Sequence, residues 1–498
     1  MNKLGRQRLQ GTDGIRRETK LSNNPECKGL TPQQVFLEKG WITEQFMELY
    51  AYSHIKNLTG PKIPKNVVVG WDPRDLSGIF IEAVIKGILK AGGNALTLGI
   101  VPTPLVPLLM LHQNADCGIM ITASHNPNDQ NGIKLFSRYR GMKPLPSDDS
   151  RLTRFILPQK YSAIKNLSLK GKRKDCRGNA LELFSGFTLA PENSWIDESI
   201  NFKKVVLVVD PTNGSLTGIA KKIFTQAGVG KVFEVNGKLN GDVNVFSGVA
   251  DLEGRDRITA EQIKNPGGYF YRHKAVVKLF EVGRKHKSSL RKGIMRAVAT
   301  IFDADADRFF MLEYDPFKDL LWVLSGDETA ILQAKHLSTQ FPEKYKGSLY
   351  INTVESDLNA AIAAEKMGLK SELTAVGDKW ILLKILLRQL EQKSKDRDCP
   401  KQKRLVFQRE AKKLKKTGIT SIASLKKLAR ILGEKSGQKK DSNPILAVGS
   451  EETGHNITES QFIRPDGEAV SIYSGNGIKS ALNTLVATEY LNFSPKKY

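Results

Sequence analysis

The sequence predicts an α/β protein of three consecutive related α/β domains with mixed sheets between helices. Apolar stretches of strand length alternate with stretches of helical spacing along most of the chain, which is typical of this class. Polar motifs directly follow several predicted strands. The length of 498 residues suits about three domains at ~150 residues each.

The first domain is expected at residues 1–199. Its predicted strands and helices alternate in this order: strand 66–69, helix 79–91, strand 94–99, helix 105–111, strand 117–122 and strand 132–136. The polar stretch 138–201 has no clear periodicity and is expected to be a linker.

The second and third domains are expected at residues 200–323 and 324–498. The second has predicted strands at 203–210, 232–235 and 297–302, and a helix at 215–226. The third has predicted helices at 329–336, 358–367, 380–389 and 478–491, and strands at 348–352, 372–376 and 444–448. Two stretches interrupt the alternation, about 256–291 and about 388–440, and both are expected to be basic insertions.

The positive charge is concentrated in one segment. The formal net charge is +24, and residues 388–440 hold 18 Lys and Arg against five acids. Helical spacing at 411–416 and 422–432 favours a solvated basic helical hairpin. Nucleic-acid binding is the less favoured alternative, because Phe407 is the segment's one aromatic residue.

The cysteine pattern and hydropathy indicate a cytoplasmic protein. The four cysteines form no CxxC pair, which argues against a zinc site or a disulfide framework and for a reducing compartment. The N-terminus lacks the apolar region of a signal peptide, and no stretch approaches 18 apolar residues. We therefore expect no membrane partner.

The most informative motif is Asp303-Ala304-Asp305-Ala306-Asp307-Arg308. In an extended segment, alternate side chains project to the same side, so the three carboxylates can converge. Three converging carboxylates repel each other unless a cation lies among them. Oxygen ligands select a hard ion, Mg²⁺ before Ca²⁺.

Three further motifs carry polar groups at strand ends or in glycine turns. Ser124 follows a predicted strand and precedes His125-Asn126-Pro127, and Lys134 lies on the next strand. Arg16 follows Gly11-Thr12-Asp13-Gly14-Ile15, and arginine suits phosphate. Glu451, Thr453 and His455 follow the strand 444–448 and could bind sugar hydroxyls. Each string alone is also compatible with an ordinary polar turn or a surface residue.

Together, the four strings resemble the α-D-phosphohexomutase family of phosphoglucomutase, phosphomannomutase and phosphoglucosamine mutase. Val376-Gly377-Asp378-Lys379 and Gly475-Asn476-Gly477 add to the similarity. The resemblance implies that Ser124 is phosphorylated and that Mg²⁺ is held by Asp303, Asp305, Asp307 and the phosphoserine. It implies a hexose 1,6-bisphosphate as activator.

The resemblance also implies roles for the surrounding residues. The residues implied to take part in phosphoryl or proton transfer with Ser124 are Arg16, Lys134 and His125. Those implied to bind the substrate are Arg308, Gly377, Asp378, Lys379, Glu451, Thr453 and His455.

The implied reaction is the interconversion of a hexose 1-phosphate and a hexose 6-phosphate. Glu452 favours glucose or mannose as the sugar, whereas Asp378 resembles the loop of phosphoglucosamine mutases. A non-catalytic sugar-phosphate-binding paralogue is the alternative from another class.

Family members usually continue into a fourth domain, which clamps the substrate's second phosphate. The resemblance implies that this domain is absent here. A separate polypeptide could supply it, the basic segment 388–440 could replace it, or the chain is a shortened inactive paralogue.

Overall fold

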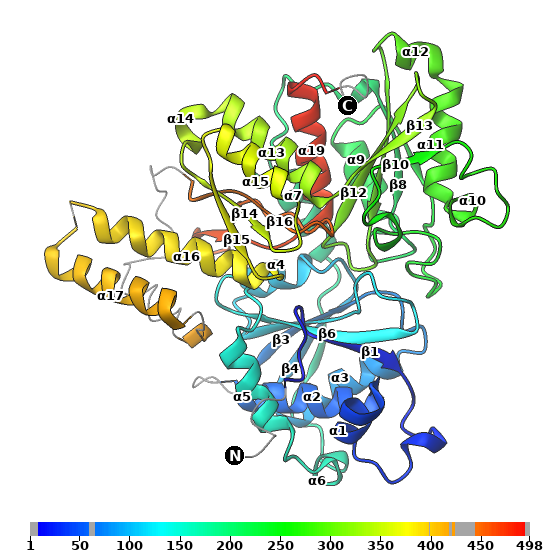
Figure 1. Ribbon diagram of the computed structural model, residues 1–498. Coiled ribbons are helices and arrows are strands. Elements are labelled where there is room, and N and C mark those ends of the chain that lie inside the picture. Colours follow the sequence, from blue (N-terminus) through cyan, green and yellow to red (C-terminus); the bar gives the residue numbers. More distant parts are fainter. Residues whose placement is uncertain (1–7, 59–64, 398, 418–420, 424–443, 494–498) are drawn as a thin grey trace.

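The computed structural model describes residues 8–58, 65–397, 399–417, 421–423 and 444–493. It is a mixed α/β structure with three larger sheets and a two-stranded one, which confirms the predicted fold class. The first sheet and its helices form the lower part of the molecule in Figure 1, and the other two sheets lie side by side above it.

The first sheet is seven-stranded and mixed. In sheet order its strands are β2 (Trp41–Ile42), β1 (Ile15–Thr19), β6 (Gln130–Ser137), β5 (Cys117–Ile121), β3 (Asn66–Trp71), β4 (Asn94–Ile100) and β7 (Arg173–Asp175). Both faces are covered, as the run Val67-Val68-Val69 requires. Val67 and Val69 pack in the core with helices α2 (Glu44–Asn57) and α3 (Ile79–Lys90), whereas Val68 packs in the core with α4 (Leu105–His112).

The expectation that residues 138–201 form a linker is wrong. The segment contains α5 (Pro146–Ile156), α6 (Tyr161–Lys165), β7, α7 (Ala180–Leu189) and α8 (Pro191–Ser194). Helix α5 buries five residues at helical spacing, Leu152 and Ile156 among them, so this helix did leave a periodic signal that the sequence analysis missed. Helices α6 and α8 have only five and four residues, too few for a clear period.

The second sheet is six-stranded and mixed. Its order is β10 (Arg257–Thr259), β13 (Leu320–Leu324), β12 (Phe309–Asp315), β11 (Arg296–Phe302), β8 (Val205–Asp210) and β9 (Lys231–Glu234). Helix α9 (Ile219–Gln226) packs in the core on one side of this sheet. The segment 256–291 supplies β10 at the sheet edge and α11 (Lys274–Lys285) in the core on the other side, with α10 (Tyr269–Arg272) and α12 (Lys287–Arg291).

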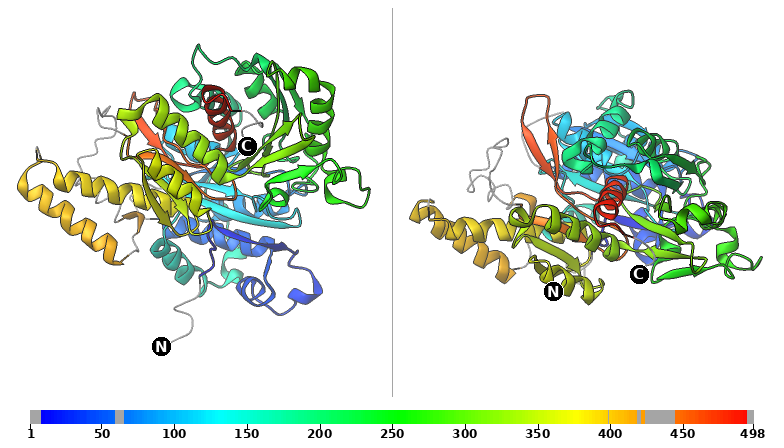
Figure 2. Two further views of the ribbon diagram at one scale, coloured as in Figure 1. Left: turned by 45° about the horizontal axis from the view of Figure 1, so that its top comes forward. Right: turned by 90° about the horizontal axis from the view of Figure 1, so that it is seen from above.

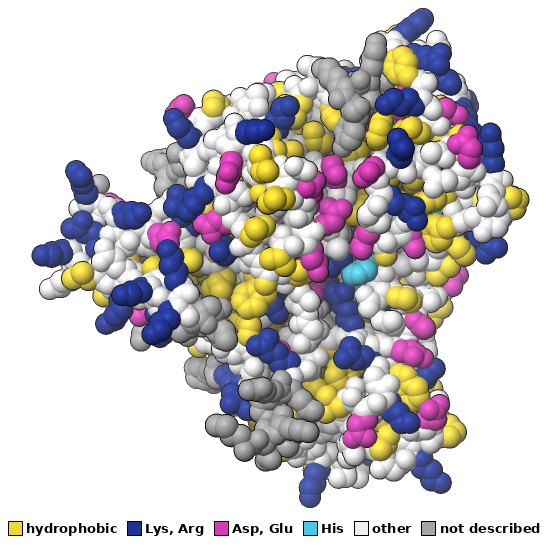
Figure 3. Space-filling view, viewed as in Figure 1, with side chains coloured by type: hydrophobic (Ala, Val, Ile, Leu, Met, Phe, Trp, Pro, Cys, Tyr) yellow, Lys and Arg dark blue, Asp and Glu magenta, His cyan; other side chains and the backbone are white. Residues whose placement is uncertain are grey.

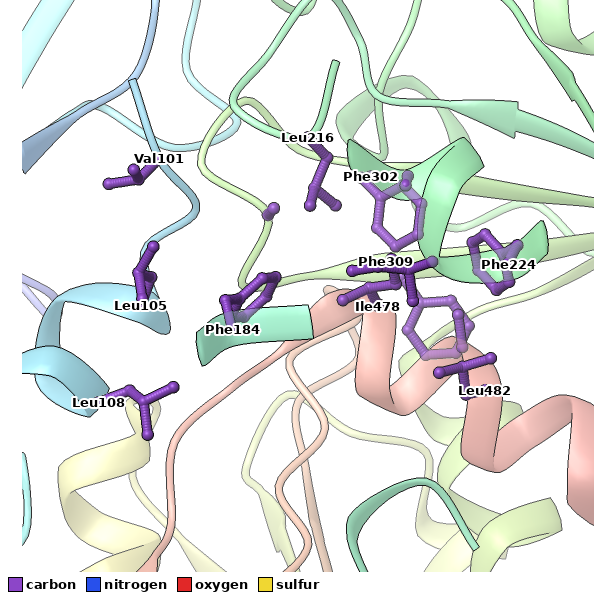
Figure 4. Packing of buried hydrophobic residues seen from close by; sticks show 14 of the residues in the cluster. Val101, Leu105, Leu108, Phe184, Leu216, Phe224, Phe302, Phe309, Ile478 and Leu482 are labelled. Carbon is purple, nitrogen blue, oxygen red and sulfur yellow. The ribbon is translucent and has the colours of Figure 1, made fainter. Parts of the chain in front are cut away.

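The third sheet has three parallel strands in the order β15 (Lys370–Thr374), β14 (Leu349–Thr353) and β16 (Leu446–Ser450). Its helices are α13 (Gly326–Gln340), α14 (Pro342–Tyr345), α15 (Leu358–Lys366) and α16 (Asp378–Lys395), and a hairpin of β17 (Ser460–Ile463) and β18 (Ala469–Ile472) follows. The last helix, α19 (Gly477–Tyr490), returns to the second sheet. Figure 4 shows its Ile478 and Leu482 beside Phe302 and Phe309.

The basic segment begins within α16 and continues into α17 (Lys401–Thr417), which lies alongside it and projects from the body in Figures 1 and 2. The expected helix 411–416 is the C-terminal part of the longer α17, and the observed hairpin pairs α17 with α16 rather than with the expected helix 422–432. The expected helix 422–432 lies outside the described residues beyond position 423. In the described part of the chain, no helix is both long and apolar enough to cross a bilayer.

Candidate active site

Strand β11 ends at the acidic loop and brings its three carboxylates together. Oxygens of Asp303, Asp305 and Asp307 lie within 4.8 Å of one another, and all three side chains are buried. Ala306 has φ +62°, so the loop turns back tightly toward β12. The convergence predicted from the spacing is present, although a turn rather than an extended strand produces it.

Ser124 lies directly against the acidic loop. Its Oγ donates a hydrogen bond of 2.6 Å to Oδ2 of Asp303, and its side chain is buried. Ser124 has φ +56°, a left-handed conformation that costs a non-glycine residue about 1 kcal/mol or more. Contacts from elsewhere in the fold must therefore hold the serine in place.

Arg74, which the sequence analysis did not single out, supplies most of those contacts. Its guanidinium pairs with Asp72 at 2.9 Å and donates to the carbonyl oxygens of Ser124 (2.7 Å), Pro127 (3.1 Å) and Gln130 (2.9 Å). Asp72-Pro73-Arg74 follows β3 just as the Ser124 loop follows the neighbouring parallel strand β5. Because the two loops follow the carboxyl ends of neighbouring parallel strands, they lie side by side, and this position after β3 is the signal that could have identified Arg74.

The second sheet's unit also holds the serine loop. The side-chain amide of Asn244 donates to the carbonyl oxygens of Ser124 and Asn126, each at 2.9 Å. In the other direction, Thr103 after β4 donates from Oγ1 to Oδ2 of Asp305 at 2.5 Å. The serine loop and the acidic loop thus position each other across the boundary between two units.

Lys134, on β6, is buried among carboxylates. Its Nζ lies 2.7 Å from Asp305, 2.5 Å from Asp307 and 3.2 Å from Asp13. Burial alone would lower the pKa of Lys134, but these acids outweigh burial and raise the pKa above its ordinary value. Lys134 is therefore a fixed cation in this structure.

Asp13 and Lys143 extend the charged network to the third sheet, and the sequence analysis assigned neither a role. Lys143 Nζ contacts Oδ1 of Asp13 and lies 2.9 Å from Oδ2 of Asp378. His455 lies 3.7 Å from Asp378 and 3.8 Å from Asp307. Burial raises the pKa of Asp13, but Lys134, Lys143 and Arg16 outweigh it and hold that pKa well below its usual range.

The acidic loop suits a hard divalent cation. Oδ1 of Asp305 and Oδ1 of Asp307 are buried without a hydrogen-bond partner. Burial and the neighbouring Asp305 and Asp307 raise the pKa of Asp303 well above its usual range. A cation among these oxygens would relieve both the repulsion and the unsatisfied acceptors, and an all-oxygen donor set favours Mg²⁺ or Ca²⁺.

A cleft of about 720 Å³ adjoins this centre. Figure 3 shows acidic and basic side chains meeting where the lower and upper parts of the molecule join. The predicted residues that line the cleft are Arg16, His125, Arg308, Gly377, Asp378, Glu451, Thr453 and His455. Lys379 does not line it. Ser124, Lys134 and the three aspartates are buried next to the cleft rather than on its wall.

Arg308 has the clearest capacity for an anion on the cleft wall. Its Nε and Nη1 are buried without a partner, and its backbone N–H donates to Asp303 at 3.2 Å. Burial lowers the pKa of Arg308, but Glu451, Asp307 and Asp303 outweigh it, so the guanidinium stays charged. In contrast, burial and the nearby Arg308 lower the pKa of His125 to about 2, so its imidazole is neutral.

Glu451 and Glu452 face different surroundings. Glu451 lines the cleft, and its Oε1 accepts a 2.9 Å hydrogen bond from the backbone of Gly377. Glu452 is not part of the cleft lining and accepts a 2.8 Å hydrogen bond from Ser325. Burial, followed by the nearby Asp327 and Glu328, raises the pKa of Glu452 to about 8, although the Ser325 hydrogen bond opposes this.

Comparisons with known proteins identify a similar family. Domain I of the phosphoglucomutase/phosphomannomutase family, an alpha/beta/alpha domain, matches residues 7–159, and domain III matches residues 325–390. Two parts of the chain thus match this family, in agreement with the resemblance of its motifs.

Curated relatives include two phosphoglucosamine mutases. That of Prochlorococcus marinus (strain MIT 9312) is 28% identical over 349 residues, which are 69% of this chain and 66% of the relative. That of Clostridium kluyveri (strain ATCC 8527) is 29% identical over 381 residues, which are 75% of this chain and 69% of the relative. The match thus spans about two thirds of each relative's length.

Solved structures share the fold. A phosphoglucomutase/phosphomannomutase family protein from Burkholderia thailandensis aligns with a TM-score of 0.56 at 16% identity, covering 99% of this chain and 80% of that one. The Paramecium phosphoprotein parafusin, a phosphoglucomutase, aligns with a TM-score of 0.52 at 16% identity, covering 98% of this chain and 71% of that one.

Proposed function

We propose that the protein is a phosphohexomutase that moves a phosphoryl group between Ser124 and a hexose phosphate. The observation that carries the proposal is the 2.6 Å contact between Ser124 Oγ and Asp303, within a centre that suits Mg²⁺ and adjoins the cleft. Phosphoryl transfer depends mainly on positioning and charge neutralisation, and this arrangement offers both.

The chain's own residues would act as follows. In the phosphorylated enzyme, the bond between phosphorus and Ser124 Oγ breaks as a sugar hydroxyl forms a new bond to phosphorus, and the hydroxyl proton leaves to a base. The reverse transfer from the other phosphate of the bisphosphate restores phosphoserine. Arg16 and Arg308 would hold phosphate oxygens from the cleft wall, and Lys134 would stabilise charge as a cation.

Mg²⁺, held by Asp303, Asp305 and Asp307, would neutralise charge on the transferred group. Glu451 and Thr453 would bind sugar hydroxyls from the cleft wall, and His455 would lie beside them. Arg74 and Asn244 would keep the serine aimed at the metal loop, since both hold its carbonyl oxygen.

For the sugar, we propose glucosamine phosphate ahead of glucose or mannose phosphate. Glu452 favoured glucose or mannose, but its side chain is turned to Ser325 rather than lining the cleft. Glu451 and Glu355 do line the cleft and suit a protonated 2-amino group. The curated relatives named above are phosphoglucosamine mutases.

A mutase assay tests the proposal. The chain is supplied with Mg²⁺, a trace of the matching 1,6-bisphosphate and, in turn, glucosamine, glucose or mannose 6-phosphate. We expect 1-phosphate formation, fastest with glucosamine, and its loss in Ser124→Ala. Equal turnover in Ser124→Ala would exclude a phosphoserine mechanism. No turnover with any sugar would favour the non-catalytic alternative.

The expectation that a separate polypeptide supplies a fourth domain finds no support in the comparisons.

A further inference from the structure

The α16–α17 hairpin is placed to act on the cleft through the first unit. The domain III match ends at residue 390, so α17 lies outside the part of the chain that matches the family. None of the described residues of 388–440 lines the cleft. Helix α16 begins at the cleft-lining Asp378, whereas α17 can act on the site only through the residues that it packs against.

The hairpin's apolar face is buried together with residues of the first unit. Phe407, Ala411 and Leu414 of α17 are at most 9% exposed. They share one buried cluster with Met142 and Leu145, which lie between β6 and α5 of the first unit. The cluster also contains residues of α16, such as Ile385 and Leu386, and of the third sheet and the chain after it (Leu349, Ile351, Leu446, Ile457 and Tyr473).

A hydrogen bond ties the chain after α17 to the same place. Oδ2 of Asp148, in the first turn of α5, accepts a 2.9 Å hydrogen bond from the backbone N–H of Ile422. The same oxygen accepts from the backbone N–H of Leu145 at 3.3 Å. One carboxylate thus joins Ile422, which follows α17 in the chain, to Leu145.

Lys143 lies between the two buried anchors Met142 and Leu145. Its side chain is buried and bridges Asp13, in the Gly11–Gly14 turn, to Asp378, at the start of α16. Asp378 follows Gly377, whose backbone N–H donates to Glu451 on the cleft wall. Lys143 therefore connects the first unit to the loop that positions a proposed sugar-binding residue.

We propose that the α16–α17 hairpin is a brace that positions Lys143, and that Lys143 in turn fastens the 376–379 loop to the Gly11–Gly14 turn across the cleft. Lys143 is a positioning residue in this account. Only the kinetic test of this proposal rests on the proposed function, because it requires an active mutase. Its structural readout, hydrogen exchange, does not need an active enzyme.

The test compares two truncations on α17 of the full chain. Phe407→Ala removes a buried side chain of the brace, whereas Leu405→Ala removes one that is 56% exposed on the same helix. We expect Phe407→Ala to speed hydrogen exchange at 139–145 and at 376–379, and Leu405→Ala to match wild type. Unchanged exchange at both segments in Phe407→Ala would overturn the brace. Should Phe407→Ala fail to fold, Asp148→Ala removes the acceptor that Ile422 and Leu145 share and tests the same junction.

Kinetics separate positioning from a general loss of structure. We expect Phe407→Ala and Lys143→Met each to raise KM for the hexose phosphate about tenfold with kcat changed less than about threefold. A loss of folded enzyme would lower kcat at constant KM instead. Lys143→Arg should recover part of the loss, because the positive charge remains.

A double-mutant cycle tests whether the hairpin acts through Lys143. If it does, Phe407→Ala added to Lys143→Met should change KM by less than about twofold further. Independent effects would multiply to about a hundredfold, and that result would overturn the link. If wild type shows no turnover, the proposed function fails, and the exchange comparison still decides the brace.

Discussion

Oγ of Ser124 lies 2.6 Å from Oδ2 of Asp303, although the two residues are 179 positions apart in the chain. Each comes directly after a buried strand, β5 or β11, in a different sheet. The carboxyl ends of these two interior strands meet at this contact. Thr103 of the first unit donates a hydrogen bond to Asp305, and Asn244 of the second unit donates one to the carbonyl oxygen of Ser124. A nucleophile held against a metal loop is the arrangement that phosphoryl transfer needs.

Thr103 should control metal affinity without touching the metal. Its Oγ1 donates to Asp305, and removing such a support typically costs 10- to 100-fold in metal affinity. We expect Thr103→Val to need about tenfold more Mg²⁺ for half-maximal activity. Thr97→Val on β4 is the control, because Thr97 donates only to the carbonyl oxygen of Lys174. Identical Mg²⁺ titrations for the two variants would refute the role of Thr103.

Arg74 should be irreplaceable by lysine. One guanidinium makes bonds to a carboxylate and to three carbonyl oxygens, which a single ammonium group cannot reproduce. We expect Arg74→Lys to lower kcat about 10- to 100-fold through misplacement of Ser124. Arg173→Lys, at an exposed pair with Glu82, should leave kcat unchanged. An unaltered kcat in Arg74→Lys would show that Asn244 alone suffices to hold the serine loop.

Asp210 should make stability depend on pH. Burial raises the pKa of Asp210 to about 7, whereas its ordinary value is 3.8, and its Oδ2 has no partner. Between these values the native state binds more protons than the unfolded state, so this contribution to stability is lost as pH rises through 7. Relative to wild type, we expect Asp210→Asn to raise the free energy of unfolding by up to about 4 kcal/mol at pH 8, and by little at pH 4.

Urea unfolding at the two pH values measures this difference. The hydrogen bonds that Asp210 accepts from Thr212 and Asn236 use Oδ1, which asparagine keeps. A stability difference that does not change between pH 4 and pH 8 would mean that Asp210 is not protonated in the native protein.

Glu452 should not choose the sugar. Its carboxyl contacts Ser325, near the start of α13, and glutamine retains an acceptor there. We expect Glu452→Gln to keep the wild-type ratio of rates among glucosamine, glucose and mannose phosphates within about twofold. Glu451→Gln, on the cleft wall, should change that ratio. A large shift in Glu452→Gln would restore the expectation of glucose or mannose.

The regular strands could be predicted from the sequence, because they leave local signals. The strand 203–210 was predicted from its continuous apolar run and is β8, Val205–Asp210. The convergence of the three aspartates was predicted from their spacing, although a turn after β11 produces it. The segment 138–201 was misinterpreted although α5 buries residues at helical spacing, whereas α6 and α8 are too short to leave a clear period.

The contacts across sheets left no local signal. Lys143 bridges two acids that are far from it in sequence, and Arg74 acts on a loop 50 positions away. From the sequence alone, a lysine or arginine is expected at the surface, so a buried one cannot be recognised until its partners in the fold are known. The positions of Ser124 and Asp303 could be predicted separately, whereas the residues that hold them together required the fold.

The most direct test of the central claim is phosphate transfer to Ser124. The purified chain is incubated with Mg²⁺ and glucosamine 1,6-bisphosphate, and then with glucose 1,6-bisphosphate, and is examined by mass spectrometry of the intact protein and its peptides. We expect one phosphate per chain, on Ser124, in wild type and in Ser77→Ala, and none in Ser124→Ala. No phosphate in wild type, or the same phosphate in Ser124→Ala, would contradict the account.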